Sequence, residues 1–204
     1  MSTGILTDVR IRAAIEEGDI KITPFNSEQV NPTSYDLTLG NEVVIYSDWV
    51  ETYDVTGSNE PLDGRHFTPL NRCLDAKAEP KTKSFTIDPE KGWVLKPGIG
   101  YLMHTQERIC TKQFVPILDG KSSIGRLFIQ VHATAGFGDP GFDGQFTLEV
   151  LVQHPVRVYP GMRICQIRFQ DMNGWVGQTY DKVGHYRGTE ALGARPSQAW
   201  RQFR

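Results

Sequence analysis

Short runs of β-branched, aromatic and aliphatic residues follow one another along the chain, each bounded by Gly, Pro, Asp or Asn. Turn residues at such short intervals interrupt any continuing segment and leave little room for long helices. The pattern predicts strands at 20–23, 35–39, 42–46, 84–87, 92–95, 100–106, 114–118, 126–135, 145–153 and 156–170. We therefore expect a mainly β fold, a distorted jelly roll or β-barrel rather than a doubly wound α/β sheet.

One helix is expected near the start of the chain. Thr7 can cap it, Ile11 and Ile15 fall at helical spacing, and Gly18 suits its end. Residues 51–83 are polar and rich in turn residues, which predicts a long excursion over the surface. The 204 residues suit a single domain, with 178–204 as a C-terminal tail that is expected to close over the functional site. The composition of 185–204 suits a segment that orders against a ligand or a neighbouring subunit.

Charge and composition narrow the partners. Lys plus Arg number 22 and Asp plus Glu 24, so no global basic field favours nucleic acid or an anionic membrane. No apolar run approaches the roughly 18 residues of a membrane span, and we expect a soluble cytoplasmic protein. The three cysteines lack the paired spacing of a zinc site and are expected to be reduced and structural.

The segment "DGKSSIGR" (119–126) places two hydroxyls, a lysine and an arginine between glycines. Such a loop lets backbone N–H groups, hydroxyls and a guanidinium approach a phosphate closely. It does not have the residue order of a Walker A loop. An ordinary solvated turn explains the same residues equally well.

The segment "HATAGFGDPGFDG" (132–144) must turn sharply. Asp139 could accept a hydrogen bond from a sugar hydroxyl, and Phe142 could stack on the sugar. The alternative is an Asp-Pro-Gly turn with Phe142 in the core. His132, between Val131 and Ala133, is more typical of a satisfied core residue than of a ligand or a base.

Glu149 lies in a predicted strand whose period-two alternation places Phe146, Leu148 and Val150 on one face. Thr147 and Glu149 fall on the other face. That face could be solvated, or it could line a pocket in which the carboxylate serves as general base and then as acid. The five histidines form no zinc-deaminase motif, so we expect hydrolysis driven by a carboxylate and no protein-bound metal.

The stretch "GKSSIGRLFIQVHATAGFGDPGFDGQFTLE" followed by "YPGMRICQIRF" resembles the signature region of the deoxycytidine triphosphate (dCTP) deaminases. They are the zinc-independent branch of the trimeric dUTPase-like superfamily. The opening "ILTDVRIRAAIEEGDIKITPFNSEQVNPTSYDLTLG" and the tail "GARPSQAWRQF" are similar to the ends of that family. The resemblance covers nearly the whole chain and is most specific over 115–170.

The resemblance implies a jelly-roll-like fold and a homotrimer whose active sites are shared between subunits. It implies that Glu149 activates the water that attacks C4 of cytosine, and that Ser122 and Arg126 hold this water and stabilise the intermediate. Magnesium is expected on the substrate triphosphate rather than on protein ligands. The remaining substrate-binding positions implied by the resemblance are Lys121, Ser123, Ala135, Asp139, Phe142, Thr147, Tyr180 and His185.

The chain departs from the family pattern in two places. Phe142 stands where several relatives have Trp. In the tail, His185 and the later Thr189 and Glu190 replace a Lys and a Gln that grip phosphates, and two residues are added before Pro196. These changes motivate the hypothesis that the substrate is a 5-substituted dCTP.

The main prediction is the hydrolytic deamination of dCTP, or of a 5-substituted dCTP, to deoxyuridine triphosphate (dUTP) and ammonia. One alternative is a bifunctional enzyme that proceeds to the monophosphate dUMP. The other is a nucleotide-binding regulator without turnover.

Overall fold

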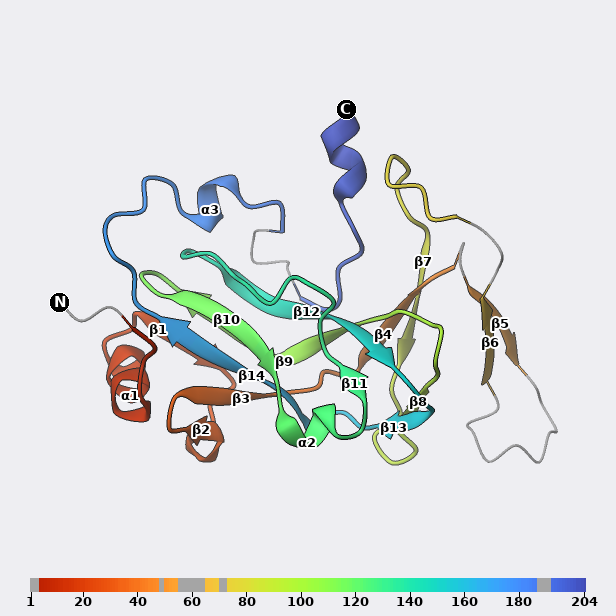
Figure 1. Ribbon diagram of the computed structural model, residues 1–204, viewed down its shortest axis with the longest axis horizontal. Helices are drawn as coiled ribbons and strands as arrows, with labels where there is room; N and C mark the ends of the chain where they lie inside the picture. Colours follow the sequence, from red (N-terminus) through yellow and green to blue (C-terminus); the bar gives the residue numbers. More distant parts are fainter. Residues whose placement is uncertain (1–3, 48–49, 55–64, 70–72, 187–191) are drawn as a thin grey trace.

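The structure, a computed structural model, describes residues 4–47, 50–54, 65–69, 73–186 and 192–204. Its six-stranded sheet has the order β11 (Ile129–Gln130), β12 (Asp143–Val152), β9 (Tyr101–Thr111), β4 (Glu42–Tyr46), β7 (Thr82–Thr86), with β1 (Ile20–Thr23) also on β9. The four-stranded sheet has the order β10 (Val115–Gly120), β14 (Arg163–Gln170), β3 (Ser34–Thr38), β2 (Val30–Asn31). Every described pairing is antiparallel, and the prediction of a mainly β fold is confirmed (Figure 1).

One hydrophobic core joins the two larger sheets. Inward-facing residues of β12 and β9 meet those of β3 and β14, because alternate side chains of each strand point to the same face. The largest fully buried side chains include Tyr35, Leu37, Tyr101, Met103 and Phe169. Only one face of β12 packs into this core, and its other face is not part of it.

The predicted N-terminal helix is confirmed as α1 (Asp8–Glu16). The Thr7 hydroxyl accepts from the Arg10 N–H at 3.5 Å, Ile11 and Ala14 are buried, and Gly18 follows the helix with φ +76°. The other described helical segments are short: η1 (Ser27–Gln29), α2 (Ser122–Gly125), α3 (Tyr180–Val183) and η2 (Ala199–Phe203). None of the helices in the described ranges has the length and apolarity that a membrane crossing requires.

The prediction of a strand over 126–135 is wrong. Residues 122–125 form α2, Phe128 adopts φ +55°, and only β11 pairs with β12. The chain then leaves β12 and runs beside β10, where the Leu118 N–H donates to the Gly136 carbonyl at 2.6 Å. The apolar run therefore bridges two sheets instead of forming one strand.

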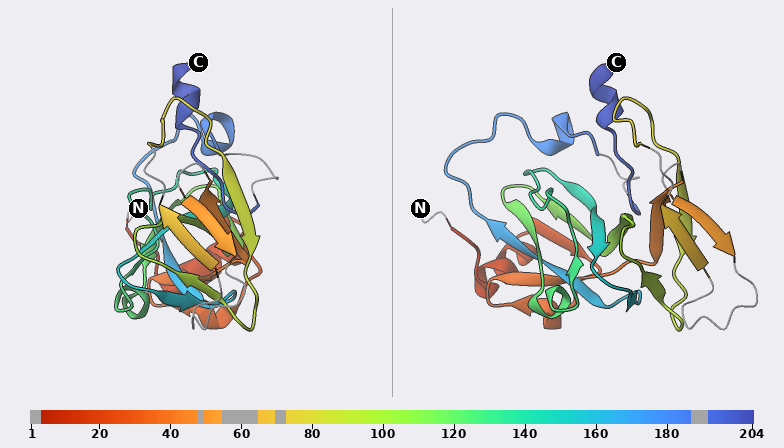
Figure 2. Two further views of the ribbon diagram at one scale, coloured as in Figure 1. Left: turned by 90° about the vertical axis from the view of Figure 1, so that its right-hand side faces the viewer. Right: turned by 45° about the vertical axis from the view of Figure 1, so that its right-hand side comes forward.

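Two other stretches differ from their predictions. The single run expected over 156–170 is two strands, β13 (Val156–Val158), which pairs with β8 (Trp93–Leu95), and β14. The turn "YPGM" separates them, with Gly161 at φ +78°. Within the expected surface excursion, β5 (Val50–Asp54) and β6 (Arg65–Pro69) pair as a hairpin that projects from the body (Figure 2). The hydrophobic pattern is too weak there to reveal strands.

The three cysteines are free thiols. Cys165 is fully buried in β14, and desolvation raises the pKa of its thiol. Cys73 is exposed. The expectation of structural cysteines fits the buried Cys165 but not the exposed Cys73.

Candidate active site

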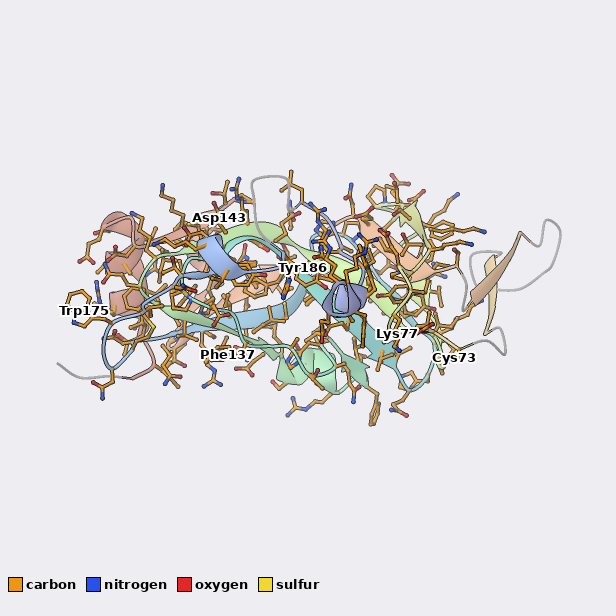
Figure 3. The ribbon with its side chains drawn as sticks, turned by 90° about the horizontal axis from the view of Figure 1, so that it is seen from above. Cys73, Lys77, Phe137, Asp143, Trp175 and Tyr186 are labelled. Carbon is orange, nitrogen blue, oxygen red and sulfur yellow. The ribbon has the colours of Figure 1, made fainter. Side chains whose placement is uncertain are left out.

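A pocket of about 340 Å³ opens on the face of β12 that does not pack into the core. The loop after β11 and the C-terminal tail form its other walls, above β12 in Figure 1. Phe137 and Tyr186, which both line it, lie near the middle of Figure 3. Six residues predicted from the sequence line this pocket: Ala135, Asp139, Phe142, Thr147, Glu149 and Tyr180.

Glu149 occupies the pocket wall because of the pleat of β12. Phe146, Leu148 and Val150 are buried, whereas Thr147 and Glu149 are half-buried on the other face. The Ala133 N–H donates to Oε2 of Glu149 at 3.1 Å. No hydrogen bond to Oε1 occurs among the described residues, so one oxygen is held while the other remains available to a water molecule in the pocket.

The loop that faces Glu149 is held by the edge of β10. Besides the bond to Gly136, the Gly138 N–H donates to the Pro116 carbonyl at 2.8 Å. Asp139 is exposed at the pocket, where its carboxylate can accept from a ligand hydroxyl. The Phe142 ring is half-buried, with its centroid 4.5 Å from that of Phe146 and 5.7 Å from that of Tyr180. Phe142 therefore packs on the core and also lines the pocket, and its contact with a sugar stays a prediction.

Gly136 permits the close contact between this loop and β10. A Cβ there would lie 2.6 Å from the backbone oxygen of Leu118 and 3.0 Å from Nε2 of His132. We expect Gly136→Ala to lower the free energy of unfolding by about 1–3 kcal/mol, because a backbone oxygen cannot move aside without shifting β10. Chemical denaturation measures this change. Gly177→Ala is the control, since nothing lies within 4 Å of its Cβ, and equal losses in the two variants would contradict the prediction.

The tail forms the remaining wall. The Tyr180 N–H donates to the Pro140 carbonyl at 2.8 Å, which docks α3 on the loop. Further along, the Arg195 N–H donates to Oγ1 of Thr147 at 3.0 Å, and the Ser197 N–H to the Tyr46 hydroxyl at 3.0 Å. The tail thus contacts the strands on which the pocket stands.

Sequence reasoning missed several pocket residues. Gln145 shares the alternating face with Thr147 and Glu149, and this signal could have found it. Tyr46 ends a strand about a hundred residues earlier, and Arg195 and Ser197 come from the tail, so no local pattern connects them with Glu149.

The predicted phosphate loop does not form part of this pocket. Ser122, Ser123 and Arg126 are exposed on or beside α2, at the opposite end of the molecule from α3 (Figures 1 and 2). None of them lines the pocket that contains Glu149. Within one chain the structure therefore does not bring these residues to the predicted catalytic carboxylate.

Lys121 differs from its prediction in another way. Its ammonium group is bonded to the carboxylate of Asp36, which is 1% exposed and also lies 3.4 Å from the Arg163 guanidinium. A buried carboxylate requires such partners because burial without them is costly. In this structure Lys121 therefore forms an ion pair with Asp36, and its charge is not free to bind a phosphate.

Two other predicted or considered residues lie beside the pocket without lining it. His185 is exposed, although Tyr186 next to it is a lining residue. His132 is half-buried, and its Nδ1 has no hydrogen-bond partner in the described structure, so it is not the satisfied core residue expected. Thr189 and Glu190 lie outside the described residues.

A metal site would need a cluster of ligands. Across the described ranges, no three His, Cys, Asp or Glu side chains gather closely enough to hold a metal ion.

Comparison with known proteins decides the family. A family model described as "dCTP deaminase-like" matches residues 5–172. The chain belongs to the dCTP deaminase-like family. The resemblance inferred from the sequence is confirmed, as is the enzyme class, a hydrolytic deaminase.

Individual members of this family resemble the chain over nearly its whole length. A protein of Clostridium acetobutylicum named "dCTP deaminase, dUMP-forming" is 39% identical over 199 residues, 98% of each chain. A protein of the same name from Leptospira biflexa serovar Patoc is 40% identical over 185 residues, 91% of this chain and 90% of its own. The crystal structure of 2'-deoxycytidine 5'-triphosphate deaminase from Agrobacterium tumefaciens aligns with a TM-score of 0.57 and 26% identity. That alignment covers 86% of this chain and 51% of the longer one.

The names of these dCTP deaminase relatives correct the main functional prediction. They specify dUMP as the product, so the prediction of an enzyme that stops at dUTP is wrong, and the bifunctional alternative agrees with them. The sequence motifs alone do not separate an enzyme that stops at dUTP from one that proceeds to dUMP.

Proposed function

We propose that this protein converts dCTP to dUMP, ammonia and pyrophosphate. The observation that carries the proposal is the Glu149 carboxylate, half-buried in the wall of a pocket of about 340 Å³ with one oxygen held by a backbone N–H. This volume lies within the usual range for small-molecule sites. Membership of the dCTP deaminase-like family and the dUMP-forming names of its relatives support the choice of substrate and product.

The first step is hydrolysis at C4 of cytosine. As the water oxygen bonds to C4, Glu149 takes a proton from the water and passes it to N3 of the ring. The carboxylate then takes the proton of the new C4 hydroxyl and gives it to the amino nitrogen as the C4–N bond breaks. Ammonia leaves and C4 becomes the carbonyl carbon of uracil. The bond from the Ala133 N–H fixes one carboxylate oxygen, which orients the other toward the water.

The cytosine base and the deoxyribose of the substrate would contact Thr147, Asp139 and Phe142 in the pocket wall. Because Oγ1 of Thr147 accepts from the Arg195 N–H, its own proton is free to donate to an acceptor on the cytosine edge. Asp139 can accept from the sugar hydroxyl, and Phe142 bounds the sugar on its apolar side.

The second step breaks the bond between the α-phosphorus and the oxygen that bridges it to the β-phosphorus. A second water supplies the new oxygen, and pyrophosphate leaves. Magnesium would be brought by the triphosphate and would offset its charge. The lack of a ligand cluster in the described ranges is compatible with a cation held mainly by the nucleotide.

The active enzyme is a homotrimer with sites shared between subunits. The support for this part is that Ser122, on α2, and Arg126, directly after it, are exposed and do not line the pocket of their own chain. Because they are exposed, this guanidinium and this hydroxyl are free to enter the pocket of a neighbouring subunit. A closed ring of three copies repeats this contact three times.

The substrate is tested by incubating the purified protein with magnesium and, separately, dCTP, dCMP and CTP. We expect ammonia release from dCTP well above that from the other two, because the pocket binds a deoxyribose and the site requires a triphosphate. Chromatography identifies the nucleotide products. Absence of ammonia release from dCTP would contradict the proposed function.

A further inference from the structure

The tail segment 193–197 is held on the sheet by side chains rather than by a strand edge. Its Gly193 N–H donates to Oε1 of Gln145 at 2.8 Å, and its Ala194 N–H to Oε2 of Glu42 at 3.2 Å. The bonds from Arg195 to Thr147 and from Ser197 to Tyr46 complete the set. Four backbone donors thus meet four side-chain acceptors, two from β4 and two from β12.

At Gly193 the tail lies too close to Glu42 for a residue that has a side chain. Gly193 has φ +82°, and a Cβ there would lie 2.6 Å from Oε2 of Glu42. A residue with a side chain at this position would be strained and would also push the carboxylate away. The sequence "GA" at 193–194 is therefore matched to Glu42.

Tyr46 lies beside Glu149 although it belongs to a different strand. Val44 of β4 pairs with Leu102 of β9, and Leu102 pairs with Glu149 of β12. Two residues beyond Val44, Tyr46 lies on the same face of the sheet. It lines the pocket together with Glu149, Leu102 and Ser197.

The Tyr46 hydroxyl can still donate a hydrogen bond. Its oxygen accepts from Ser197, and no acceptor for its own proton occurs among the described residues. Burial raises the pKa of Tyr46, and the nearby Tyr186 and Glu149 act in the same direction. The phenol thus stays protonated at neutral pH and can donate to a ligand or a water in the pocket.

We propose that Tyr46 is a positioning residue for the deamination, because its hydroxyl holds the tail closed at Ser197 and thereby completes the nucleotide pocket beside Glu149. The kinetic part rests on the proposed function, whereas the tail contact does not. Removing the hydroxyl leaves the Ser197 N–H without its acceptor while the ring still fills the same space.

Tyr46→Phe tests this with hydrogen exchange of the ligand-free protein, read on fragments that cover 192–204. We expect the Ser197 amide to exchange about fivefold to tenfold faster than in the wild type, which corresponds to the loss of one hydrogen bond. Exchange in β9 and β12 should not change. Tyr159→Phe is the matched control, because Tyr159 is 40% exposed at the turn between β13 and β14 and does not line the pocket.

Gly193→Ala tests the same closure from the tail side with Tyr46 intact. We expect faster exchange over 193–197 because the new Cβ meets Glu42. In steady-state kinetics Tyr46→Phe should raise KM for dCTP, by up to the same factor, and change kcat much less, since saturating nucleotide restores the closed tail. A purely structural role for Tyr46 would not produce this division.

Unchanged tail exchange in Tyr46→Phe would overturn the proposal, as would faster exchange that extends through β9 and β12 while Gly193→Ala leaves the tail as in the wild type. A fall in kcat with KM unchanged would also overturn it. Failure of the wild type to act on dCTP would refute the proposed function instead, and the exchange result would stand apart from it.

Discussion

Glu149→Gln is expected to lower ammonia release from dCTP by about two to four orders of magnitude, the usual contribution of a general base. Glutamine keeps the size of the side chain and can still meet the Ala133 N–H through its oxygen. It cannot take a proton from water. Turnover measured by ammonia release at saturating dCTP would therefore fall while nucleotide binding, measured by calorimetry, is largely kept.

Two comparisons make the loss specific. Glu90→Gln removes an exposed carboxylate away from the pocket and should leave turnover unchanged. The unfolding transition of Glu149→Gln should match that of the wild type, because the half-buried side chain keeps its shape. Near-normal turnover by Glu149→Gln would show that another group activates the water.

Mixing the two inactive variants Glu149→Gln and Arg126→Ala should restore activity. We expect Arg126→Ala to be inactive, because its guanidinium would be missing from the pocket of the neighbouring subunit. In mixed trimers, some sites would combine an intact Glu149 from one subunit with an intact Arg126 from the next. Random assembly of equal amounts places both in about a quarter of the sites. Turnover should therefore rise from near zero to about a quarter of the wild-type value.

Subunit exchange is obtained by unfolding the two variants together and refolding them. Each variant carried alone through the same procedure is the control and should remain inactive. Mixed samples that stay inactive, although native mass spectrometry shows mixed trimers, would mean that Arg126 does not act on the pocket of a neighbour. A monomeric wild type would contradict the shared site directly.

The local parts of the fold were predictable from the sequence. Ile11, Ile15 and Gly18 specify α1 through spacing and capping, which depend only on neighbours in the chain. The alternation around Leu148 and Glu149 specifies the strand and separates its buried face from its open one. Whether the open face meets water or a pocket depends on the tail and on the loop after β11, which no pattern within the strand contains.

The parts that depend on distant segments were not predictable. Residues 126–135 have the composition of a strand, but the chain leaves β12 after Gln130 because β10 offers carbonyl and N–H partners to Gly136 and Gly138. Lys121 was expected to face a phosphate, yet the buried Asp36 from β3 takes its charge. Such competition between partners is decided by tertiary structure.

The most direct test of the central claim follows labelled dCTP with the wild-type protein and measures ammonia, pyrophosphate and the labelled nucleotide in the same samples. We expect equal amounts of ammonia and pyrophosphate at every time point, with dUMP as the labelled product. Ammonia without pyrophosphate, with accumulation of dUTP, would contradict the conversion to dUMP. Pyrophosphate without ammonia would contradict the deamination itself.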